Sequence, residues 1–389
     1  MFTELVRFKD LTSGQIDRWK ELISTQAGYD SPFFHPKFTE VVSSVRSDIF
    51  VILHGSGDQI QMFWPIQKSG KSADPAGAPF ADYHGPIMSA DWRGRPSDIL
   101  EQIGLRSFKF TSLFDPRHRF ADYALERDGT FVCDLSVGAD EFFETQRTLF
   151  PRHTKKMRRL ARKVEREVGE MEFRFDDKDQ DAFNQILSWK SRQYKETGRH
   201  DVLAPEWVRS MFQILWSSDE TGCRGCFHTL KHGDKLVAGE FNLLSNKTIH
   251  GWIPAFDHEF WSYSPGYLLQ DEIIKHATAV GFLDYDLGVS SEHYKKYYAN
   301  FQIPVIAGSI RSHNMRSGLD SLGETAWHGL ETAGIPTVSA LAGKIRRRYA
   351  MIRTVETTTG DRLRGIANAA SLLLHAKSEP KENLANSAD

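Results

Sequence analysis

Acid–base chemistry is first indicated by Glu240, which stands inside the predicted strand Leu236–Leu244. Side chains alternate between the two faces of a strand, so Glu240 should share a face with Ala238 and Asn242. A buried carboxylate is costly without a partner or a task, which makes Glu240 a candidate general base. His250, in the next predicted strand, has an intrinsic pKa that suits the same role. Each of them is otherwise a hydrogen-bonded structural group.

A third polar candidate is Asp286, which lies at the end of the predicted strand Phe282–Leu287 and is followed by Gly288. A carboxylate at the end of a strand that faces a cleft can orient a substrate hydroxyl. It can equally accept hydrogen bonds from the following turn. The sequence leaves both roles open, and we carry Asp286 forward as a candidate catalytic residue.

Phosphate binding is indicated at Ser264, Pro265 and Gly266, where a loop meets a predicted helix over 265–280. Pro265 sets the φ angle of the first helical turn, and Ser264 is a candidate N-cap. The first N–H groups of a helix are unpaired, and they lie at the positive end of its dipole. Gly266 has no Cβ, so a phosphate could approach this backbone closely.

Three short motifs occur in a fixed order here: Ser264-Pro265-Gly266-Tyr267-Leu268-Leu269, then Asp286-Leu287-Gly288, then Tyr294-Lys295. This order resembles the S-P-G-x-L-L, D-x-G and Y-K motifs of GNAT-superfamily acetyltransferases. It looks most similar to the CelD-type branch, which is associated with cellulose and exopolysaccharide biosynthesis. The resemblance extends loosely over residues 130–305 and more weakly over 30–130. The superfamily's usual phosphate loop is rich in arginine and glycine, whereas here only Gly266 stands in for it.

The resemblance implies an acyl-transfer site that takes acetyl-CoA as its donor. The residues implied to hold the donor are Ser264, Pro265, Gly266, Tyr267 and Leu268. Tyr294 would give a proton to the departing thiolate, although the spacing also allows Tyr297, and these rings could simply pack. Lys295 would pair with a phosphate or a substrate carboxylate, or lie in solvent. Trp252 and Arg159 complete the set of candidate substrate contacts.

A strongly basic helix is predicted over 151–169, with one apolar stripe formed by Met157, Leu160, Ala161, Val164 and Val168. Lysines and arginines, among them Arg159, occupy most of the remaining surface. This pattern is typical of a solvated helix face, but it also suits a phosphate or an anionic glycan. Nucleic acid is not expected, because no aromatic residues are interleaved with the basic ones.

The elements that must position these residues follow one order twice along the chain. A hairpin with a Gly-Asp turn, a strand containing a His-Gly pair, a helix and a strand are predicted over 49–114 and again over 226–287. Lys68–Pro79 is expected to be a surface loop, and Tyr83–Met88 a strand. Two related lobes explain this order, in an arrangement that also resembles the FemAB aminoacyl transferases. We expect a single active site, formed by the second lobe.

The predicted fold class is therefore α/β, with two GNAT-like lobes (a tandem acyl-CoA N-acyltransferase fold) and a helical C-terminal extension. The expected divisions are an N-terminal lobe over 1–130, a catalytic lobe over 131–312 that includes the basic helix, and a tail over 313–389. The tail alternates helical patches with basic clusters. The last dozen residues, rich in Ser, Lys, Glu and Asn, are predicted to be disordered.

Composition narrows the functional classes. The chain has 389 residues and a net charge of −2, which argues against a general polyanion-binding protein but permits local basic patches. It has three cysteines, and the pair Cys223 and Cys226 with His228 is interpreted as ordinary strand residues rather than a metal site. The N-terminus does not resemble a signal peptide, and no stretch is apolar enough to span a membrane. We expect a soluble, cytoplasmic protein without a metal.

The sequence thus predicts an acyltransferase that moves acetyl from acetyl-CoA to a hydroxyl or amine of a polysaccharide or its sugar precursor. The glycan acceptor is implied by the family resemblance alone, and the polysaccharide synthesis machinery is a possible partner. Two alternatives stay open. One is a FemAB-like aminoacyl transferase that draws on charged tRNA, and the other is a non-catalytic glycan-binding accessory of polysaccharide biosynthesis.

Overall fold

The computed structural model describes residues 1–289, 294–312 and 336–375. Contacts divide the chain into two units, one made of 1–190 with 206–318 and the other of 191–205 with 319–389. The candidate residues named above all fall in the first unit. The predicted disorder of the last dozen residues falls outside the described part of the chain.

The first lobe comprises the elements from β1 to β6. Its helices are α1 (Ser13–Ser24), α2 (Pro36–Val45) and α3 (Pro96–Gln102), and its strands are β1 (Phe2–Val6), β2 (Ile49–Ser56), β3 (Gln59–Ser69), β4 (Ser72–Pro75), β5 (Ile87–Met88) and β6 (Ser107–Leu113). Local sequence explains the boundaries. Thr12 and Gln15 form a capping box at the start of α1, and α2 and α3 both begin with proline.

The second lobe comprises the elements from α4 to β12. Its helices are α4 (Ala139–Leu149), α5 (Pro151–Glu167), α6 (Gln180–Glu196), α7 (Glu206–Trp216), α8 (Pro265–Ala279) and the 3-10 helix η4 (His258–Tyr263). Its strands are β8 (Glu172–Arg174), β9 (Arg224–His232), β10 (Lys235–Leu244), β11 (Thr248–Phe256) and β12 (Asp284–Val289). The expected basic helix, the hairpin of β9 and β10 and the helix after Ser264 are all present.

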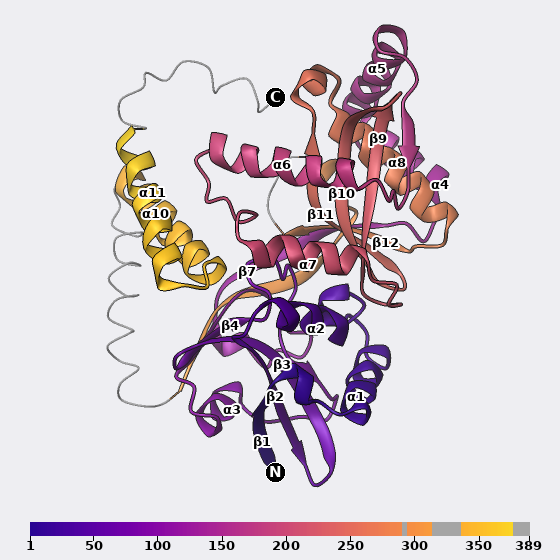
Figure 1. The fold of residues 1–389 in the computed structure, drawn as a ribbon. Coiled ribbons are helices and arrows are strands. Elements are labelled where there is room, and N and C mark those ends of the chain that lie inside the picture. The colour runs from indigo at the N-terminus through magenta and orange to yellow at the C-terminus, as the bar shows by residue number, and fades with distance from the viewer. Residues whose placement is uncertain (290–293, 313–335, 376–389) are drawn as a thin grey trace. The chain divides into compact units, whose positions relative to one another are not determined.

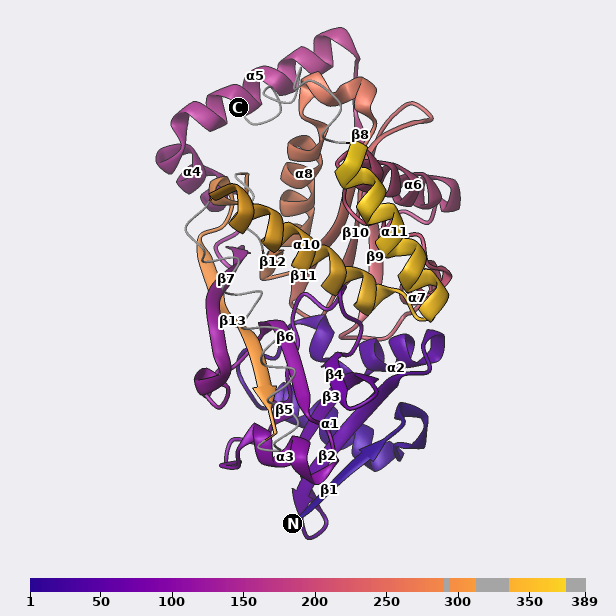
Figure 2. The same ribbon diagram turned by 90° about the vertical axis from the view of Figure 1, so that its left-hand side faces the viewer.

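One continuous sheet joins the two lobes (Figures 1 and 2). Its order is β1-β2-β3-β4-β6-β13-β7-β12-β11-β10-β9-β8, with β5 paired to β3. Strands β7 (Ala124–Asp134) and β13 (Phe301–Arg311) lie between the lobes, and β13 pairs with β6 on one side and with β7 on the other. The expected boundary at residue 130 falls inside β7. The last strand in the described part of the chain, β13, therefore bonds to a strand of the first lobe.

Two irregularities in the second lobe bear on the site. Strands β11 and β12 are parallel and share only three residue pairs, the last of which joins His250 to Asp286, although both strands continue beyond it. A bulge between β10 and β11 pairs Phe241 with Ile253 and Asn242 with Gly251, which leaves Trp252 as the extra residue. The main chain of β11 beyond His250 is thus not bonded to β12.

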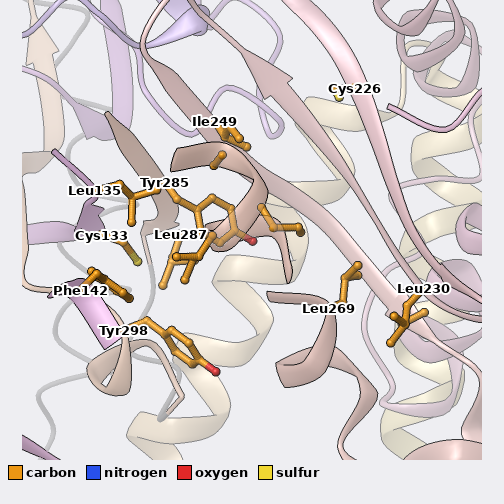
Figure 3. Close-up of a cluster of buried hydrophobic side chains, with 14 of the residues drawn as sticks. Cys133, Leu135, Phe142, Cys226, Leu230, Ile249, Leu269, Tyr285, Leu287 and Tyr298 are labelled. Carbon is orange, nitrogen blue, oxygen red and sulfur yellow. The ribbon is translucent and has the colours of Figure 1, made fainter. Parts of the chain in front are cut away.

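The core of the second lobe lies between the sheet and α8 (Figure 3). Apolar side chains from β7, β9, β10, β11 and β12 meet Leu269, Ile273, Ile274 and Ala277 of α8. Tyr285 and Tyr298 belong to the same cluster, so their rings are packed inside it. This packing fixes the position of the first turn of α8 relative to the end of β12.

Two expectations for the first lobe are wrong. Lys68–Pro79 is not a surface loop, because β3 continues to Ser69 and the chain turns at Gly70 into β4, which is largely buried. Its small residues suit a tightly packed inner strand as well as a loop, and β4 pairs with both β3 and β6. Of Tyr83–Met88 only Ile87 and Met88 form a strand.

The second unit contains α10 (Pro336–Val355) and α11 (Thr359–His375), together with the end of α6 and the loop that follows it. His200 lies 3.0 Å from the Glu356 carboxylate, and Arg348 donates a hydrogen bond to the Gly198 carbonyl. These contacts hold the helices to the 191–205 segment. The fold class, with its helical C-terminal extension, is confirmed. In the described part of the chain no helix is long and apolar enough to cross a bilayer.

Candidate active site

His250 is the fully buried centre of a polar network at the junction of the lobes. Its Nε2 lies 2.9 Å from Asp82 of the first lobe, and its Nδ1 lies 3.5 Å from Asp286 on the neighbouring strand. Burial alone would lower the pKa of His250, but the Asp286 and Asp82 carboxylates outweigh it and raise that pKa to about 9. At neutral pH His250 is therefore a cation held between two carboxylates, which does not suit a general base.

Asp286 is the buried carboxylate of this network. One carboxylate oxygen accepts the Tyr83 hydroxyl at 2.5 Å, and the other accepts the Gly288 backbone N–H at 2.7 Å. Tyr83 is also within hydrogen-bond distance of Thr130. Burial, followed by the charge of Asp286, raises the pKa of Tyr83 well above its usual range. Asp286 thus both bonds to Gly288 near the end of β12 and joins the lobes, and its catalytic role stays a prediction.

Glu240 occupies a separate buried position one strand away. The Tyr285 hydroxyl lies 2.9 and 3.0 Å from its two carboxylate oxygens. Burial raises the pKa of Glu240 to about 7. The hydrogen bond from Tyr285 lowers this pKa, but by less than burial raises it. A Cβ on Gly251 would lie 2.4 Å from a carboxylate oxygen of Glu240, so glycine makes room for this carboxyl. Glu240 therefore lies beside β11, one residue beyond its last pair with β12.

The tyrosine-rich turn packs onto α8 and α5. The Tyr298 hydroxyl donates to Asp271 of α8 at 2.7 Å, and the Tyr297 ring stacks on His153 of α5 with 3.9 Å between centroids. Tyr294 is half-buried, and its ring meets the edge of Tyr267 in the first turn of α8. Tyr294 thus lies beside the start of α8.

Lys295 is buried, so the expectation that it might lie in solvent is wrong. Its ammonium donates to the backbone carbonyls of Gly288 and Val289, at 3.2 and 3.0 Å. These carbonyls lie where β12 ends, beyond its last pair with β11, and the buried cation satisfies them. Binding of a phosphate or carboxylate by Lys295 stays a prediction.

The first turn of α8 is open only at Gly266, because Pro265 has no N–H and the next two N–H groups have a backbone partner. Ser264 has a left-handed conformation with φ 53°, and among the described residues no side chain caps the helix. The Ser264 carbonyl accepts the N–H groups of Tyr267 and Leu268, and Gly266 is exposed with open space where a Cβ would be. Ser264 is therefore not the predicted side-chain cap. The arrangement around Gly266 is compatible with a ligand phosphate.

Residues 151–296 match the family model described as "Acetyltransferase (GNAT) domain". This segment contains α5, the strands β8 to β12, α8 and the Tyr294–Lys295 pair. This part of the second lobe is therefore similar to a GNAT acetyltransferase domain. Among curated proteins the comparison found no match.

Three solved structures are similar to this chain at low sequence identity. A structure titled as FemX is 10% identical, covers 83% of this chain and 99% of its own, and has a TM-score of 0.51. The C-terminal domain of a putative lysylphosphatidylglycerol synthetase from Agrobacterium fabrum is 14% identical, with 80% and 95% covered and a TM-score of 0.49. A tandem GNAT protein from the clavulanic acid biosynthesis pathway is 9% identical, with 80% and 99% covered and a TM-score of 0.46. At these identities the FemX likeness shows the fold alone.

The two remaining substrate-binding candidates are Trp252 and Arg159. Trp252 is buried among aromatic rings that include Phe33 and Phe212, and its indole N–H donates to the Phe80 carbonyl at 3.1 Å. This packing accounts for Trp252 as part of the contact between the lobes. Arg159 is exposed on α5. A substrate-binding role for either one stays a prediction.

Four residues that contact His250, Asp286 or Glu240, directly or through Tyr83, were not predicted from the sequence: Asp82, Tyr83, Thr130 and Tyr285. Asp82 and Tyr83 come from the first lobe and precede His84-Gly85, the counterpart of His250-Gly251, so the internal repeat was a usable signal. Tyr285 directly precedes the Asp286-Leu287-Gly288 motif, and strand alternation places it on the opposite face from Asp286. Across the described ranges no group of three or more His, Cys, Asp or Glu side chains is arranged to hold a metal ion.

Proposed function

We propose that the GNAT domain transfers an acetyl group from acetyl-CoA to a hydroxyl or amine of a sugar, either in a polysaccharide or in its precursor. The observation that carries the proposal is the placement of Glu240. The Glu240 carboxyl group has a pKa of about 7 and lies against β11, at the point where β11 and β12 stop pairing. Along the chain, β11 leads through η4 into the start of α8. A general base works best when its pKa lies near the operating pH.

The donor is assigned to the first turn of α8. The Gly266 N–H at the helix start, with open space beside it, suits a pyrophosphate oxygen, whereas Pro265 has no N–H and the Ser264 carbonyl accepts those of Tyr267 and Leu268. The main chain of β11 beyond His250 is not bonded to β12, so its N–H groups are placed to polarise the thioester carbonyl. Ser264, Pro265, Tyr267 and Leu268 would shape the same turn.

Glu240 and Tyr294 would exchange protons with the reacting groups. Glu240 accepts the proton of the acceptor hydroxyl or amine while the acceptor oxygen or nitrogen bonds to the acyl carbon. The carbon–sulfur bond then breaks, and Tyr294 donates its proton to the departing thiolate. Tyr285 bonds to Glu240, and Tyr294 lies against Tyr267 in the first turn of α8. The products are the acetylated acceptor and free CoA.

His250 has a positioning role in this scheme. As a buried cation it ties Asp82 of the first lobe to Asp286 at the last shared pair of β11 and β12. It therefore holds the two strands at the point from which they diverge. This assignment replaces the prediction of His250 as an alternative base, because a pKa of about 9 leaves it protonated at neutral pH.

The acceptor class rests on the resemblance of the three ordered motifs to CelD-type acetyltransferases, and polysaccharide-synthesis proteins are the partners we propose for it. The test is release of free CoA from acetyl-CoA, monitored with a thiol reagent, in the presence of fractionated sugar nucleotides and oligosaccharides. We expect release above the background hydrolysis rate with one fraction only. Binding of acetyl-CoA with no acceleration by any sugar fraction would retain the acetyl-CoA site and reject the acceptor. Transfer from aminoacyl-tRNA instead would identify a FemAB-like enzyme.

A further inference from the structure

Helix α5 has a basic surface that the proposed acyl-transfer site does not use. Its buried stripe contains Met157, Leu160 and Val164. Its basic residues form two rows at helical spacing, Arg152, Lys156, Arg159 and Lys163 along one edge, and Lys155, Arg158, Arg162 and Arg166 along the other. The helix has 17 residues, so the basic face extends about 25 Å.

Most of these cations have no acidic partner. Lys163 and Arg166 lie near Glu167, at 3.7 and 2.6 Å. In the part of the chain that the structure describes, the other six basic side chains of α5 form no ion pair: Arg152, Lys155, Lys156, Arg158, Arg159 and Arg162. The net charge of the whole protein is only −2, so this is a local concentration of positive charge.

This arrangement is unfavourable for the helix by itself. Like charges four residues apart repel, and five such basic pairs occur between Arg152 and Arg166. The first turn also carries basic residues and no acidic residue, although the start of a helix favours negative charge. A helix selected only for stability would have a mixed-charge outer face. The surface therefore fits an extended anionic partner that neutralises several cations at once.

Exposed apolar side chains flank the basic face. Leu149 lies two positions before the first residue of α5 and is 60% exposed, and Trp261 of η4 is also 60% exposed. Helix η4 packs against the C-terminal half of α5, where Lys163 lies 4.8 Å from the centre of the Tyr263 ring. Figures 1 and 2 both show α5 and the segment leading into α8 at the same end of the first unit. A large aromatic ring beside clustered cations is typical of surfaces that contact a bilayer interface.

We propose that the basic face of α5, with Leu149 and Trp261, attaches the protein peripherally to an anionic phospholipid bilayer. The apolar stripe of α5 is occupied by the protein core, so the helix does not insert. Cations supply the attraction to anionic headgroups, and Leu149 and Trp261 enter the interface. The two rows contain no aromatic residue that could stack on bases, which favours a bilayer over RNA. The inference is independent of the identity of the acyl acceptor.

The test is sedimentation of the full-length protein with vesicles of phosphatidylcholine alone, or of phosphatidylcholine with 30% phosphatidylglycerol, at low and high salt. We expect binding only to the anionic vesicles, and at least a tenfold loss of partitioning at high salt. The variant Arg152→Gln/Lys155→Gln/Arg158→Gln/Arg162→Gln should lose partitioning by at least tenfold. Its circular dichroism and melting temperature should show that it still folds.

The matched control removes the same charge from exposed, unpaired positions on other elements, in Lys9→Gln/Lys71→Gln/Arg95→Gln/Arg127→Gln. This variant should bind the anionic vesicles within about twofold of the unaltered protein. Trp261→Ser should bind the anionic vesicles more weakly than the unaltered protein at the same salt concentration. Equal losses in the two quadruple variants, binding to neutral vesicles, or salt-dependent binding to tRNA without vesicle binding would each overturn the proposal.

Discussion

Replacement of Glu240 by glutamine should make the protein more stable and less active. Glu240 is 7% exposed, and burial raises its pKa from 4.5 to about 7. Each pKa unit corresponds to 1.36 kcal/mol, so a folded chain that ionises Glu240 loses about 3 kcal/mol of stability. Glutamine has nearly the same shape, carries no charge and can still bond to the Tyr285 hydroxyl. The substitution therefore removes the cost of ionising a buried carboxyl group.

The sign follows from proton binding. Between pH 4.5 and about 7 the folded state holds the Glu240 proton and the unfolded state has lost it, so stability falls as pH rises through this range. Glu240→Gln removes this component. The free energy of unfolding of the variant should therefore exceed that of the unaltered protein by an amount that grows by about 2–3 kcal/mol from pH 5 to pH 8. Urea unfolding at the two pH values measures the difference.

The same variant should lower kcat by a hundredfold to ten-thousandfold, which is the usual contribution of a positioned general base. The unaltered enzyme should show kcat/KM rising through about pH 7 and level above it, because Glu240 acts in its ionised form. Glu259→Gln, at an exposed position in η4, is the control for both measurements. A stability difference that does not depend on pH would refute the assigned burial cost, and full activity would remove Glu240 from its role as base.

Four further variants test the remaining parts of the site. Gly266→Ala should fold as well as the original, since a Cβ there meets open space, but should weaken acetyl-CoA binding at least tenfold by calorimetry. Tyr294→Phe should lower kcat far more than affinity for acetyl-CoA, and an unchanged rate would reject its role as acid. Asp82→Asn should lower the free energy of unfolding by about 1 kcal/mol below pH 6.5, where His250 is charged in both the folded and the unfolded state. Above about pH 9, where His250 is neutral in both, the variant should be as stable as the unaltered protein. Gly251→Ala should displace the Glu240 carboxylate and lower kcat, with thermal stability changed by only a few degrees.

Local sequence was sufficient for the elements that carry their own signals. Pro265 and the apolar stripe of α8 predict the helix, and alternation predicts that Glu240 is buried. The error at Lys68–Pro79 arose because small residues and proline occur both in loops and in closely packed inner strands. Only the tertiary pairing of β4 with β3 and β6 distinguishes the two.

The electrostatic network could not be predicted for a different reason. The pKa of His250 depends on Asp82, which is 168 residues away in the sequence and is brought close by the packing of the lobes. Without Asp82 and Asp286 a buried histidine would be neutral, as His228 is, whose pKa burial lowers to about 3. The residue type alone therefore could not distinguish a general base from a structural cation.

The central claim is that acetyl-CoA binds at the first turn of α8 and that Glu240 is the base for the transfer. Hydrogen–deuterium exchange of the full-length protein, with and without saturating acetyl-CoA, tests it most directly. We predict slower exchange of the amides of Gly266, Tyr267 and Leu268 and of β11 beyond His250, with little change in the first-lobe strands β1 and β2. Unchanged exchange across the start of α8 at millimolar acetyl-CoA would contradict the account.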